Sequence, residues 1–279
     1  ISMRKKFMRF PEGKTKAVTL SYDDNIEEDQ HLITLMEKYQ MKGTFNLIPG
    51  WFAKEGTIYP EDETYRLVSA SMAKKMYDHS LVEVANHGYT HKYMSTLTTM
   101  EMTQEVLKCR NVLEAMYGTL VRGMAYPYGW HSEALRNVLS LCGITYCRTV
   151  NSTRNFELPQ NWLEWNPTCH HDDPQLMELT EKFVKGDVAE SPQLFYLWGH
   201  TFEFERNNNW QVMEQFMKTV SGRQDIWYVA NGEIYDYVKA YEALIYSADG
   251  KRIVNPSRQP VWIAIDDITY EIKDQIVLD

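Results

Sequence analysis

Five short segments of this chain carry residue types that work together in hydrolysis, and each follows an apolar run. They are residues 21–25, 87–91, 126–129, 147–149 and 198–200. Together they supply two adjacent carboxylates, two histidines four residues apart, a Pro-Tyr-Gly turn, an arginine and a further histidine. This combination is typical of metal-assisted hydrolysis, in which a metal with an open coordination position activates water.

The two histidines of the second segment are His87 and His91. Their spacing predicts that both imidazoles lie on one side of a helical turn, within ~6 Å of each other and close enough to share a metal ion. Taken alone, this spacing also occurs between unrelated histidines. Gly88 stands where the zincin signature requires a glutamate, which excludes that class of metalloprotease.

The two carboxylates belong to Asp23 and Asp24, which directly follow an apolar run. Neighbouring side chains at a strand end point in different directions, so Asp24 can complete a His-His-carboxylate set while Asp23 faces the activated water. The alternative is a solvated turn that caps a helix. In the third segment, Pro127 fixes a turn that leaves the Tyr128 amide free to stabilise an oxyanion. The alternative is an ordinary turn without a catalytic role.

Elements that could position these segments alternate along the chain. Apolar runs of strand length lie at residues 17–22, 43–48, 81–85, 121–126, 144–148, 194–199 and 226–229. Between them, apolar residues at three- and four-residue spacing predict helices, with caps at Ser71 and at Thr98 followed by Glu101. This alternation predicts a parallel sheet, closed as a barrel or open and doubly wound, whose carboxyl edge gathers the five segments.

Two regions depart from this alternation. Residues 151–173 contain two prolines and three large aromatic side chains, and we expect a long loop over one end of the sheet. After residue 247 the helical pattern stops, and residues 261–265, 269–272 and 275–278 predict a small antiparallel β appendage. We therefore expect a main domain over residues 1–247 and a C-terminal β extension over residues 248–279.

Four of the segments resemble, in order, the motifs of a known family. Residues 21–25 resemble Thr-Phe-Asp-Asp-Gly, residues 87–91 resemble His-Ser/Thr-x-x-His, residues 126–129 resemble the end of Arg-x-Pro-Tyr-Gly, and residues 198–200 resemble Leu-x-His. These are the motifs of the polysaccharide deacetylases, carbohydrate esterase family four, and the resemblance extends over roughly residues 15–245. It implies an α/β fold, a distorted (β/α)7 barrel.

The resemblance also implies roles for individual residues. Asp24, His87 and His91 would hold one divalent metal ion, most often Zn²⁺, with Co²⁺, Ni²⁺ or Mn²⁺ as alternatives. Asp23 would act as general base, His200 as general acid, and the Tyr128 amide as the oxyanion donor.

Three positions depart from the family motifs. Gly88 lacks the hydroxyl that follows the first metal-binding histidine, Thr201 replaces an aspartate, and Ala125 stands where the motif arginine orients the catalytic aspartate. We predict that Arg148, at the end of the next strand, replaces this arginine and holds Asp23 through charge-assisted hydrogen bonds.

The expected reaction is removal of acetyl groups from N- or O-acetylated carbohydrate, with metal-bound water attacking the acyl carbon and Asp23 accepting its proton. Candidate substrate-binding residues are Tyr126, Pro127, Trp130, Trp165, His170, Trp198, Glu203 and Asn231. For the aromatic candidates, core packing is the alternative. Two other functions stay open: hydrolysis of small cyclic amides or ureides at the same site, and a catalytically silent glycan-binding barrel.

Composition narrows the partners. The net charge of −9 lacks the basic surface that nucleic acid requires, so we expect no nucleic-acid partner. No apolar run approaches the ~18 residues of a membrane helix, so a soluble protein is expected. A secretion signal removed ahead of Ile1 would make it an exported protein, and otherwise it is expected in the cytoplasm. The four cysteines lack metal-site spacing.

Overall fold

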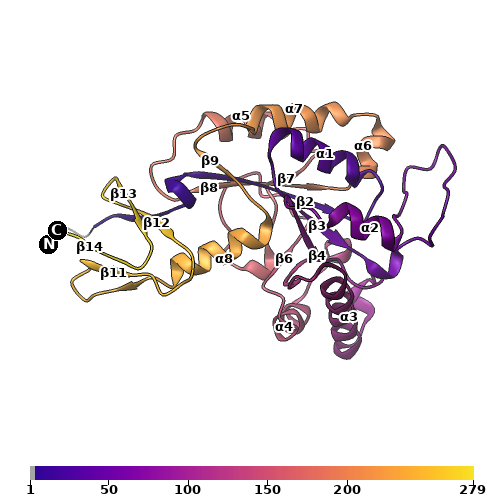
Figure 1. Ribbon diagram of the computed structural model, residues 1–279, viewed down its shortest axis with the longest axis horizontal. Coiled ribbons are helices and arrows are strands. Elements are labelled where there is room, and N and C mark those ends of the chain that lie inside the picture. Colours follow the sequence, from indigo (N-terminus) through magenta and orange to yellow (C-terminus); the bar gives the residue numbers. More distant parts are fainter. Residues whose placement is uncertain (1–3) are drawn as a thin grey trace.

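Strand β2 (Lys16–Asp23) buries all eight of its residues, as expected for a strand that is paired on both edges and covered on both faces. The computed structural model, which describes residues 4–279, places this strand within a parallel sheet curled into a half-barrel (Figure 1). The predicted α/β fold, a distorted (β/α)7 barrel with a C-terminal β appendage, is confirmed.

The sheet has the strand order β6-β5-β4-β3-β2-β8-β7, and β9 pairs with the first three residues of β2. All these pairs are parallel. The other strands are β3 (Gly43–Leu47), β4 (Val82–Asn86), β5 (Gly123–Ala125), β6 (Tyr146–Arg148), β7 (Cys169–His170), β8 (Gln193–Gly199) and β9 (Ile226–Tyr228). Their carboxyl ends therefore lie along one edge, as predicted.

Helices cover the outer face of the half-barrel, with α1, α5, α6 and α7 on one side of the view and α3 and α4 on the other (Figure 1). They are α1 (Asp29–Tyr39), α2 (Ala70–Tyr77), α3 (Thr99–Tyr117), α4 (Glu133–Leu141), α5 (Leu176–Lys185), α6 (Thr201–Asn207), α7 (Trp210–Val220) and α8 (Asn231–Glu242). Short 3-10 turns lie at Pro11–Gly13, Pro49–Trp51, Met94–Thr96, Pro127–Gly129 and Trp162–Glu164.

The cap prediction was right for one helix and wrong for another. Thr98 accepts a hydrogen bond from the Glu101 amide at 3.2 Å and begins α3 as expected. The cap of α2 is Ser69, which accepts from the Met72 amide, whereas Ser71 lies in the first turn and bonds Glu55. Serine is a good cap residue at either position, so the sequence alone does not distinguish Ser69 from Ser71. The path of the preceding loop decides which of the two begins the helix.

The expected loop 151–173 contains a strand that the sequence did not reveal. Cys169 and His170 form β7, which pairs with Leu197 and Trp198 of β8. Two residues are too few to show a strand periodicity. Helix α6 was missed for the same reason, because it begins directly after His200 and spans only Thr201–Asn207.

The C-terminal residues form two small antiparallel sheets. One has the order β1-β12-β13 and the other the order β10-β11-β14. These strands are β1 (Lys6–Arg9), β10 (Ile245–Tyr246), β11 (Arg252–Val254), β12 (Val261–Ile265), β13 (Ile268–Ile272) and β14 (Gln275–Val277). The extension therefore takes its first strand from the other end of the chain (Figure 1).

Within residues 4–279, no helix is both long enough and apolar enough to cross a membrane.

Candidate active site

The side chains of the five segments meet at the carboxyl edge of the sheet. Asp23 ends β2, and both of its oxygens are buried against donors. Arg148, which ends β6, donates to Oδ1 at 2.9 Å and to Oδ2 at 2.6 Å, and Asn46 of β3 donates to Oδ1 at 2.9 Å. Arg148 thus reaches Asp23 across the curled sheet, as the sequence predicted, although its part in catalysis stays a prediction.

The pairing with Arg148 fixes the charge of Asp23. Burial raises the pKa of Asp23, but the charge of Arg148 and its hydrogen bonds outweigh burial and hold this pKa well below its usual range. The guanidinium is itself positioned, since it also donates to Ser21 Oγ at 2.7 Å and stacks 4.4 Å from the ring centre of Trp198. A bidentate pair of this kind keeps the carboxylate ionised and fixes its direction.

Three further ligand atoms converge beside Asp23. His87 Nε2 lies 3.3 Å from Asp24 Oδ1 and 3.1 Å from His91 Nε2, and His91 Nε2 lies 3.9 Å from Asp24 Oδ1. His87 Nδ1 contacts the Ala125 carbonyl at 2.8 Å, which requires the proton on Nδ1 and leaves a lone pair on Nε2. Asp24 Oδ1 is buried and has no hydrogen-bond partner among the described residues.

These observations fit a divalent cation. Two imidazole nitrogens and a carboxylate oxygen that lie 3.1–3.9 Å from one another can share one divalent cation, once the nitrogens that face each other are deprotonated. Burial and then the neighbouring His87 lower the pKa of His91 to about 4, so that its ring is neutral at neutral pH, as a metal ligand must be.

The histidine pair lies in a loop and not in a helical turn, so that part of the prediction was wrong. Residues 87–93 follow β4 without regular structure, and Gly88 (φ 80°) and His91 (φ 52°) both adopt left-handed backbone. Glu105 of α3 holds the loop, since its Oε1 accepts from the Thr90 amide at 2.7 Å and from the Thr90 hydroxyl at 2.9 Å. The ring nitrogens therefore meet through a tertiary anchor that spacing alone does not reveal.

Left-handed backbone recurs throughout the site. Asp24 (φ 84°), Asn25 (φ 46°) and Tyr128 (φ 59°) share it with His91, and these conformations cost energy in non-glycine residues. Asn25 occupies the glycine position of the motif and offsets the cost through its side chain, whose Oδ1 accepts from the Ile48 amide at 2.7 Å. Such conformations persist where surrounding contacts enforce them, which they do here beside the metal-ligand candidates.

His200 lies on the other side of the carboxylates. Its Nε2 is 3.9 Å from Asp23 Oδ2 and 3.7 Å from Asp24 Oδ2, and its Nδ1 is 3.0 Å from Glu203 Oε1. Burial lowers the pKa of His200, but the hydrogen bond with Glu203 and the charges of Asp24 and Asp23 raise it to about 9. The ring is therefore protonated at neutral pH and can give up a proton, as a general acid does.

The turn Pro127–Gly129 brings Tyr128 beside His91. The Tyr128 amide makes no hydrogen bond within residues 4–279, consistent with a donor that is available to a bound molecule. Tyr128 is 61% exposed, and its ring packs edge-on against the rings of His91 and Tyr93. The ring of Tyr93 in turn packs against that of Trp130. On the opposite side, Trp51 packs against His91. The sequence motif indicated the Tyr128 amide but gave no signal for Trp51 or Tyr93.

Most substrate-binding candidates prove to be structural. Tyr126, Pro127 and Trp165 are buried, the Tyr126 hydroxyl donates to the Leu163 carbonyl, and Trp165 packs among Tyr146, Trp162 and Tyr196. Trp198 is buried over Arg148. Core packing therefore overturns these four assignments, and only Trp130 of the aromatic candidates remains beside the exposed rings.

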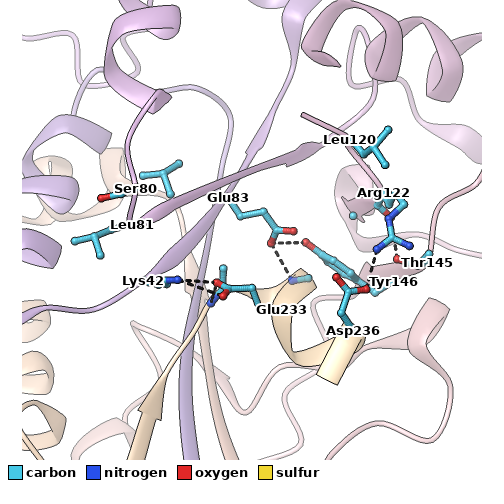
Figure 2. A pocket seen from close by; sticks show the side chains of 14 residues that line it. Lys42, Ser80, Leu81, Glu83, Leu120, Arg122, Thr145, Tyr146, Glu233 and Asp236 are labelled. Carbon is cyan, nitrogen blue, oxygen red and sulfur yellow. Dashed lines mark hydrogen bonds and ion pairs between the residues drawn. The ribbon is translucent and has the colours of Figure 1, made fainter. Parts of the chain in front are cut away.

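Asn231 lies inside the half-barrel, level with the middle of β2 and β8 and not at their carboxyl ends. It begins α8, where its side chain bonds Tyr196 and Thr19, and it is completely buried. The amino ends of the strands enclose a separate cavity of about 280 Å³ nearby, shown in Figure 2. There Glu83 accepts hydrogen bonds from Tyr146 and the Gly232 amide, and burial raises its pKa.

The remaining two candidates, His170 and Glu203, contact each other and not an open substrate face. His170 Nε2 donates to Glu203 Oε1 at 3.0 Å, and the same oxygen accepts from the His200 amide at 2.6 Å. Burial raises the pKa of Glu203, but its bonds with His170 and His200 hold it well below the usual range. Glu203 therefore orients His200. Tyr65, which donates to Asp24 Oδ2 at 3.1 Å, is a further contact that the sequence did not indicate.

A carboxylate, two histidines and an ionised Asp–Arg pair lie at the carboxyl edge of a curled parallel sheet, where α/β barrels carry their active sites. Residues 11–147 match a family model described as polysaccharide deacetylase. The matched part of the chain, residues 11–147, belongs to this family, which is carbohydrate esterase family four. No curated protein matches the sequence.

Solved structures support the same fold. A polysaccharide deacetylase structure from Mycobacterium smegmatis, itself described as putative, is 17% identical, with 84% of this chain and 93% of that chain covered and a TM-score of 0.57. The Xyl-CE4 domain of a multidomain xylanase from the hindgut metagenome of Trinervitermes trinervoides is 15% identical, with 81% and 92% covered and a TM-score of 0.53. The chain spans only 44% of a polysaccharide deacetylase from Bacillus cereus, which is 19% identical over 52% of this chain with a TM-score of 0.43.

Proposed function

We propose that this protein is a metal-dependent hydrolase that removes acetyl groups from N- or O-acetylated carbohydrate. The observation that carries the proposal is the buried Asp23–Arg148 pair beside the three converging ligand atoms of Asp24, His87 and His91. An ionised base and a set of cation ligands beside it are the two parts that metal-assisted water activation requires.

Asp24, His87 and His91 would hold the ion, and Zn²⁺ suits their mixed nitrogen and oxygen donors. When bound, the ion acts as a Lewis acid that polarises the acyl oxygen and makes water more acidic. Asp23 takes the proton of the attacking water. Arg148 keeps Asp23 ionised and fixes the direction of its oxygens, so the carboxylate is ready to accept this proton.

The remaining groups act on the acyl carbon and on the leaving group. The Tyr128 amide donates to the oxyanion as it forms, which stabilises the charge of the tetrahedral state. His200 Nε2 donates its proton to the departing amine or alkoxide, since neither leaves readily as an anion. Glu203 keeps the proton on His200 until that step.

Carbohydrate is the substrate class that the exposed aromatic side chains favour. Trp51 and Tyr128 pack directly against His91, Tyr93 packs against Tyr128, and Trp130 packs against Tyr93. Such a row of aromatic rings presents flat apolar faces beside polar groups. The polysaccharide deacetylase model matched by residues 11–147 and the polysaccharide deacetylase and xylanase-domain relatives agree with this class.

The test is acetate release by the zinc-loaded protein from N-acetylglucosamine oligomers and from O-acetylated xylo-oligosaccharides. We expect acetate from at least one of them, and none with the Asp23→Asn variant. Turnover of a cyclic ureide without acetate release from either glycan would favour the alternative hydrolase. Glycan binding without turnover of any substrate would identify a silent barrel.

A further inference from the structure

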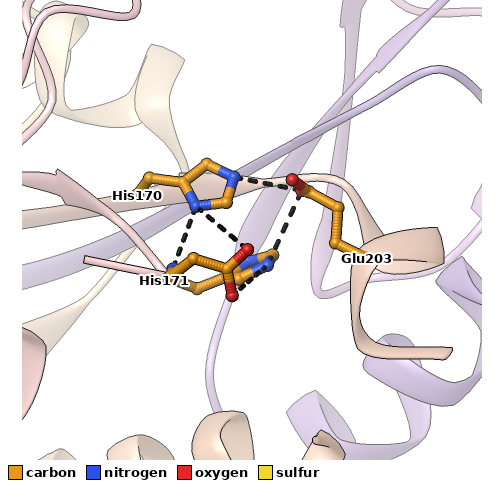
Figure 3. A group of neighbouring side chains, drawn as sticks. His170, His171 and Glu203 are labelled. Atoms are coloured by element: carbon orange, nitrogen blue, oxygen red, sulfur yellow. Dashed lines mark hydrogen bonds and ion pairs between the residues drawn. The ribbon is translucent and has the colours of Figure 1, made fainter. Parts of the chain in front are cut away.

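A second group of potential metal ligands lies next to His200, where β7 ends and α6 begins. It consists of His170, His171, Asp172 and Glu203, whose ligand atoms all lie within 4.8 Å of one another (Figure 3). None of the residues proposed to hold the catalytic ion belongs to this group. Glu203 alone connects the two regions, because it also orients His200.

His171 is the residue that points to a ligand. Its ring is fully buried, and Nδ1 is satisfied by the Tyr22 hydroxyl at 3.1 Å. Nε2 is buried too, yet it has no hydrogen-bond partner among the described residues. An unpaired buried polar atom costs about 1–3 kcal/mol, so such an atom calls for an explanation.

The groups around His171 Nε2 explain why it has no hydrogen-bond partner. Nε2 faces Asp172 Oδ1 at 3.7 Å and Glu203 Oε1 at 3.6 Å (Figure 3). Both separations are too long for hydrogen bonds. They are close to the ~3.4 Å that separates two ligand atoms when each lies ~2.1 Å from a tetrahedral ion.

His170 supports the group from outside. Its Nδ1 accepts from the Asp172 amide at 2.9 Å, so its proton lies on Nε2 and is donated to Glu203. His170 therefore orients a ligand as an outer hydrogen-bond partner. Glu203 Oε1, the oxygen 3.6 Å from His171 Nε2, also accepts from His170 and His200, whereas no hydrogen bond within residues 4–279 reaches Oε2. The carboxylate therefore keeps lone pairs for a cation.

We infer that His171 Nε2 and the carboxylates of Asp172 and Glu203 form a second site for a divalent transition-metal ion. One imidazole and two carboxylates suit Zn²⁺ or Mn²⁺. The side chain of Asp172 is 38% exposed, so an ion can enter from solvent without unfolding the segment. Occupation of this site brings a positive charge next to the carboxylate that orients His200.

Metal counting tests the inference. The full chain is stripped with a chelator, reloaded with excess Zn²⁺, passed through a desalting column and analysed by inductively coupled plasma mass spectrometry. We expect two ions in the wild type and one in Asp172→Asn. Asp173→Asn is the matched control and should keep two, since Asp173 pairs with Arg154 and lies outside the group.

The variant His91→Ala separates this site from the proposed catalytic one. One ion should remain in it, and none in the double variant with Asp172→Asn. Two ions retained by Asp172→Asn, or a single wild-type ion that only His91→Ala removes, would overturn the second site. A single ion lost in Asp172→Asn but kept in His91→Ala would support it and contradict the proposed catalytic metal instead.

A crystal soaked in Zn²⁺ gives an answer that does not depend on any variant. An anomalous peak bonded to His171 Nε2 is the expected result, and its absence at full occupancy of the Asp24 site would refute the inference.

Discussion

At the scale of single residues, the site is organised by the buried Asp23–Arg148 pair. Asp23→Asn keeps the shape of the side chain but removes its ability to accept a proton, so we expect turnover to fall by at least ~100-fold. The metal content should stay at the wild-type level, because Asp23 is not among the proposed ligands. Acetate release and metal analysis on the same preparation check both outcomes.

The same substitution leaves the Arg148 charge buried without its partner. Breaking a buried ion pair in this way costs about 3–5 kcal/mol, so the variant should also unfold at a lower denaturant concentration. Wild-type turnover by Asp23→Asn with bound metal would move the base to another residue.

Arg148→Lys tests whether geometry or charge matters at this position. A lysine keeps the positive charge but cannot donate to both oxygens of Asp23 at once, and it loses the stacking on Trp198. We expect turnover to fall by at least ~10-fold while the KM changes little, since a misdirected base affects the chemical step.

The pair Arg154–Asp173, whose arginine side chain is 46% exposed, provides the control for that experiment. Arg154 also contacts both oxygens of its carboxylate, at 2.9 and 3.3 Å, but it lies at the surface. Arg154→Lys should therefore leave turnover unchanged. Equal kinetics for Arg148→Lys and Arg154→Lys would show that the buried guanidinium has no positioning role.

At the scale of elements, the loop after β4 carries a metal-ligand candidate on left-handed backbone. Gly88 has φ 80°, and a Cβ at this position would meet only ordinary contacts of 3.5 Å or more. The cost of Gly88→Ala therefore arises from the backbone, about 1–2 kcal/mol, and the loop can relieve it by moving His91. We expect weaker Zn²⁺ binding as well as lower stability.

Gly118→Ala is the matched control because Gly118 ends α3 with φ 66° and has no atom near the added Cβ. Urea unfolding should show a similar loss for both variants, whereas a zinc titration should separate them. Unchanged zinc affinity in Gly88→Ala would mean that this glycine does not position His91.

Sequence predicted the elements better than it predicted their tertiary anchors. The long apolar runs gave the parallel strands, because a fully buried strand needs nearly every residue to be apolar. The two-residue β7 and the seven-residue α6 carry too few residues for a periodic signal. Arg148 could be predicted because the family motif has an arginine at the position of Ala125, so another basic residue had to be sought for Asp23. Glu105, Asn46 and Tyr65 belong to no motif, and only the folded chain brings them to the site.

Burial explains the errors among the substrate-binding candidates. Trp165, Tyr126 and Trp198 follow strands, as residues of an active site do, but aromatic side chains at strand ends also fill the interior of a curled sheet. The position of a residue in the sequence does not show whether its side chain points into the active site or into the protein interior.

At the scale of the whole molecule, one buried acid couples folding to pH. Asp29 is fully buried and accepts hydrogen bonds from Tyr77 and Thr201, so it ties α1 to α2 and α6. Burial raises its pKa to about 7 in spite of these bonds, against ~3.9 for an unfolded aspartate. Between these values the folded state holds a proton that the unfolded state has released, so stability falls as pH rises.

The Asp29 carboxyl should lower the free energy of unfolding by up to about 4 kcal/mol as the pH rises from 4 to 7, with no further loss above pH 7. Asp29→Asn replaces the ionisable carboxyl by an amide that does not titrate. The dependence of the unfolding free energy on pH should therefore be flatter across this window. The control Asp78→Asn changes an exposed aspartate of the same region and should keep the wild-type slope. Urea unfolding at four pH values gives the comparison, and equal slopes for wild type and Asp29→Asn would contradict the assignment.

The C-terminal extension tests whether the molecule folds as one unit. We propose a boundary near residue 247, yet β1 from the start of the chain pairs with β12, and Ile263 of β12 lies in an apolar cluster that includes Ala240 and Leu244. The Trp262 amide also donates to the hydroxyl of Tyr237 in α8. These contacts predict that the extension and the barrel unfold together.

Ile263→Ala measures this coupling. Removing a fully buried isoleucine side chain costs about 2–5 kcal/mol. All α-helices among the described residues lie between residues 29 and 242, so far-ultraviolet circular dichroism at 222 nm follows mainly the barrel. We expect Ile263→Ala to lower the melting temperature of this helical signal. Ile268→Ala, at a position 58% exposed on the neighbouring strand, should leave it unchanged. A helical melt that is the same in both variants, with a separate earlier transition in tryptophan fluorescence, would show instead that the extension is an independent unit attached to a self-sufficient barrel.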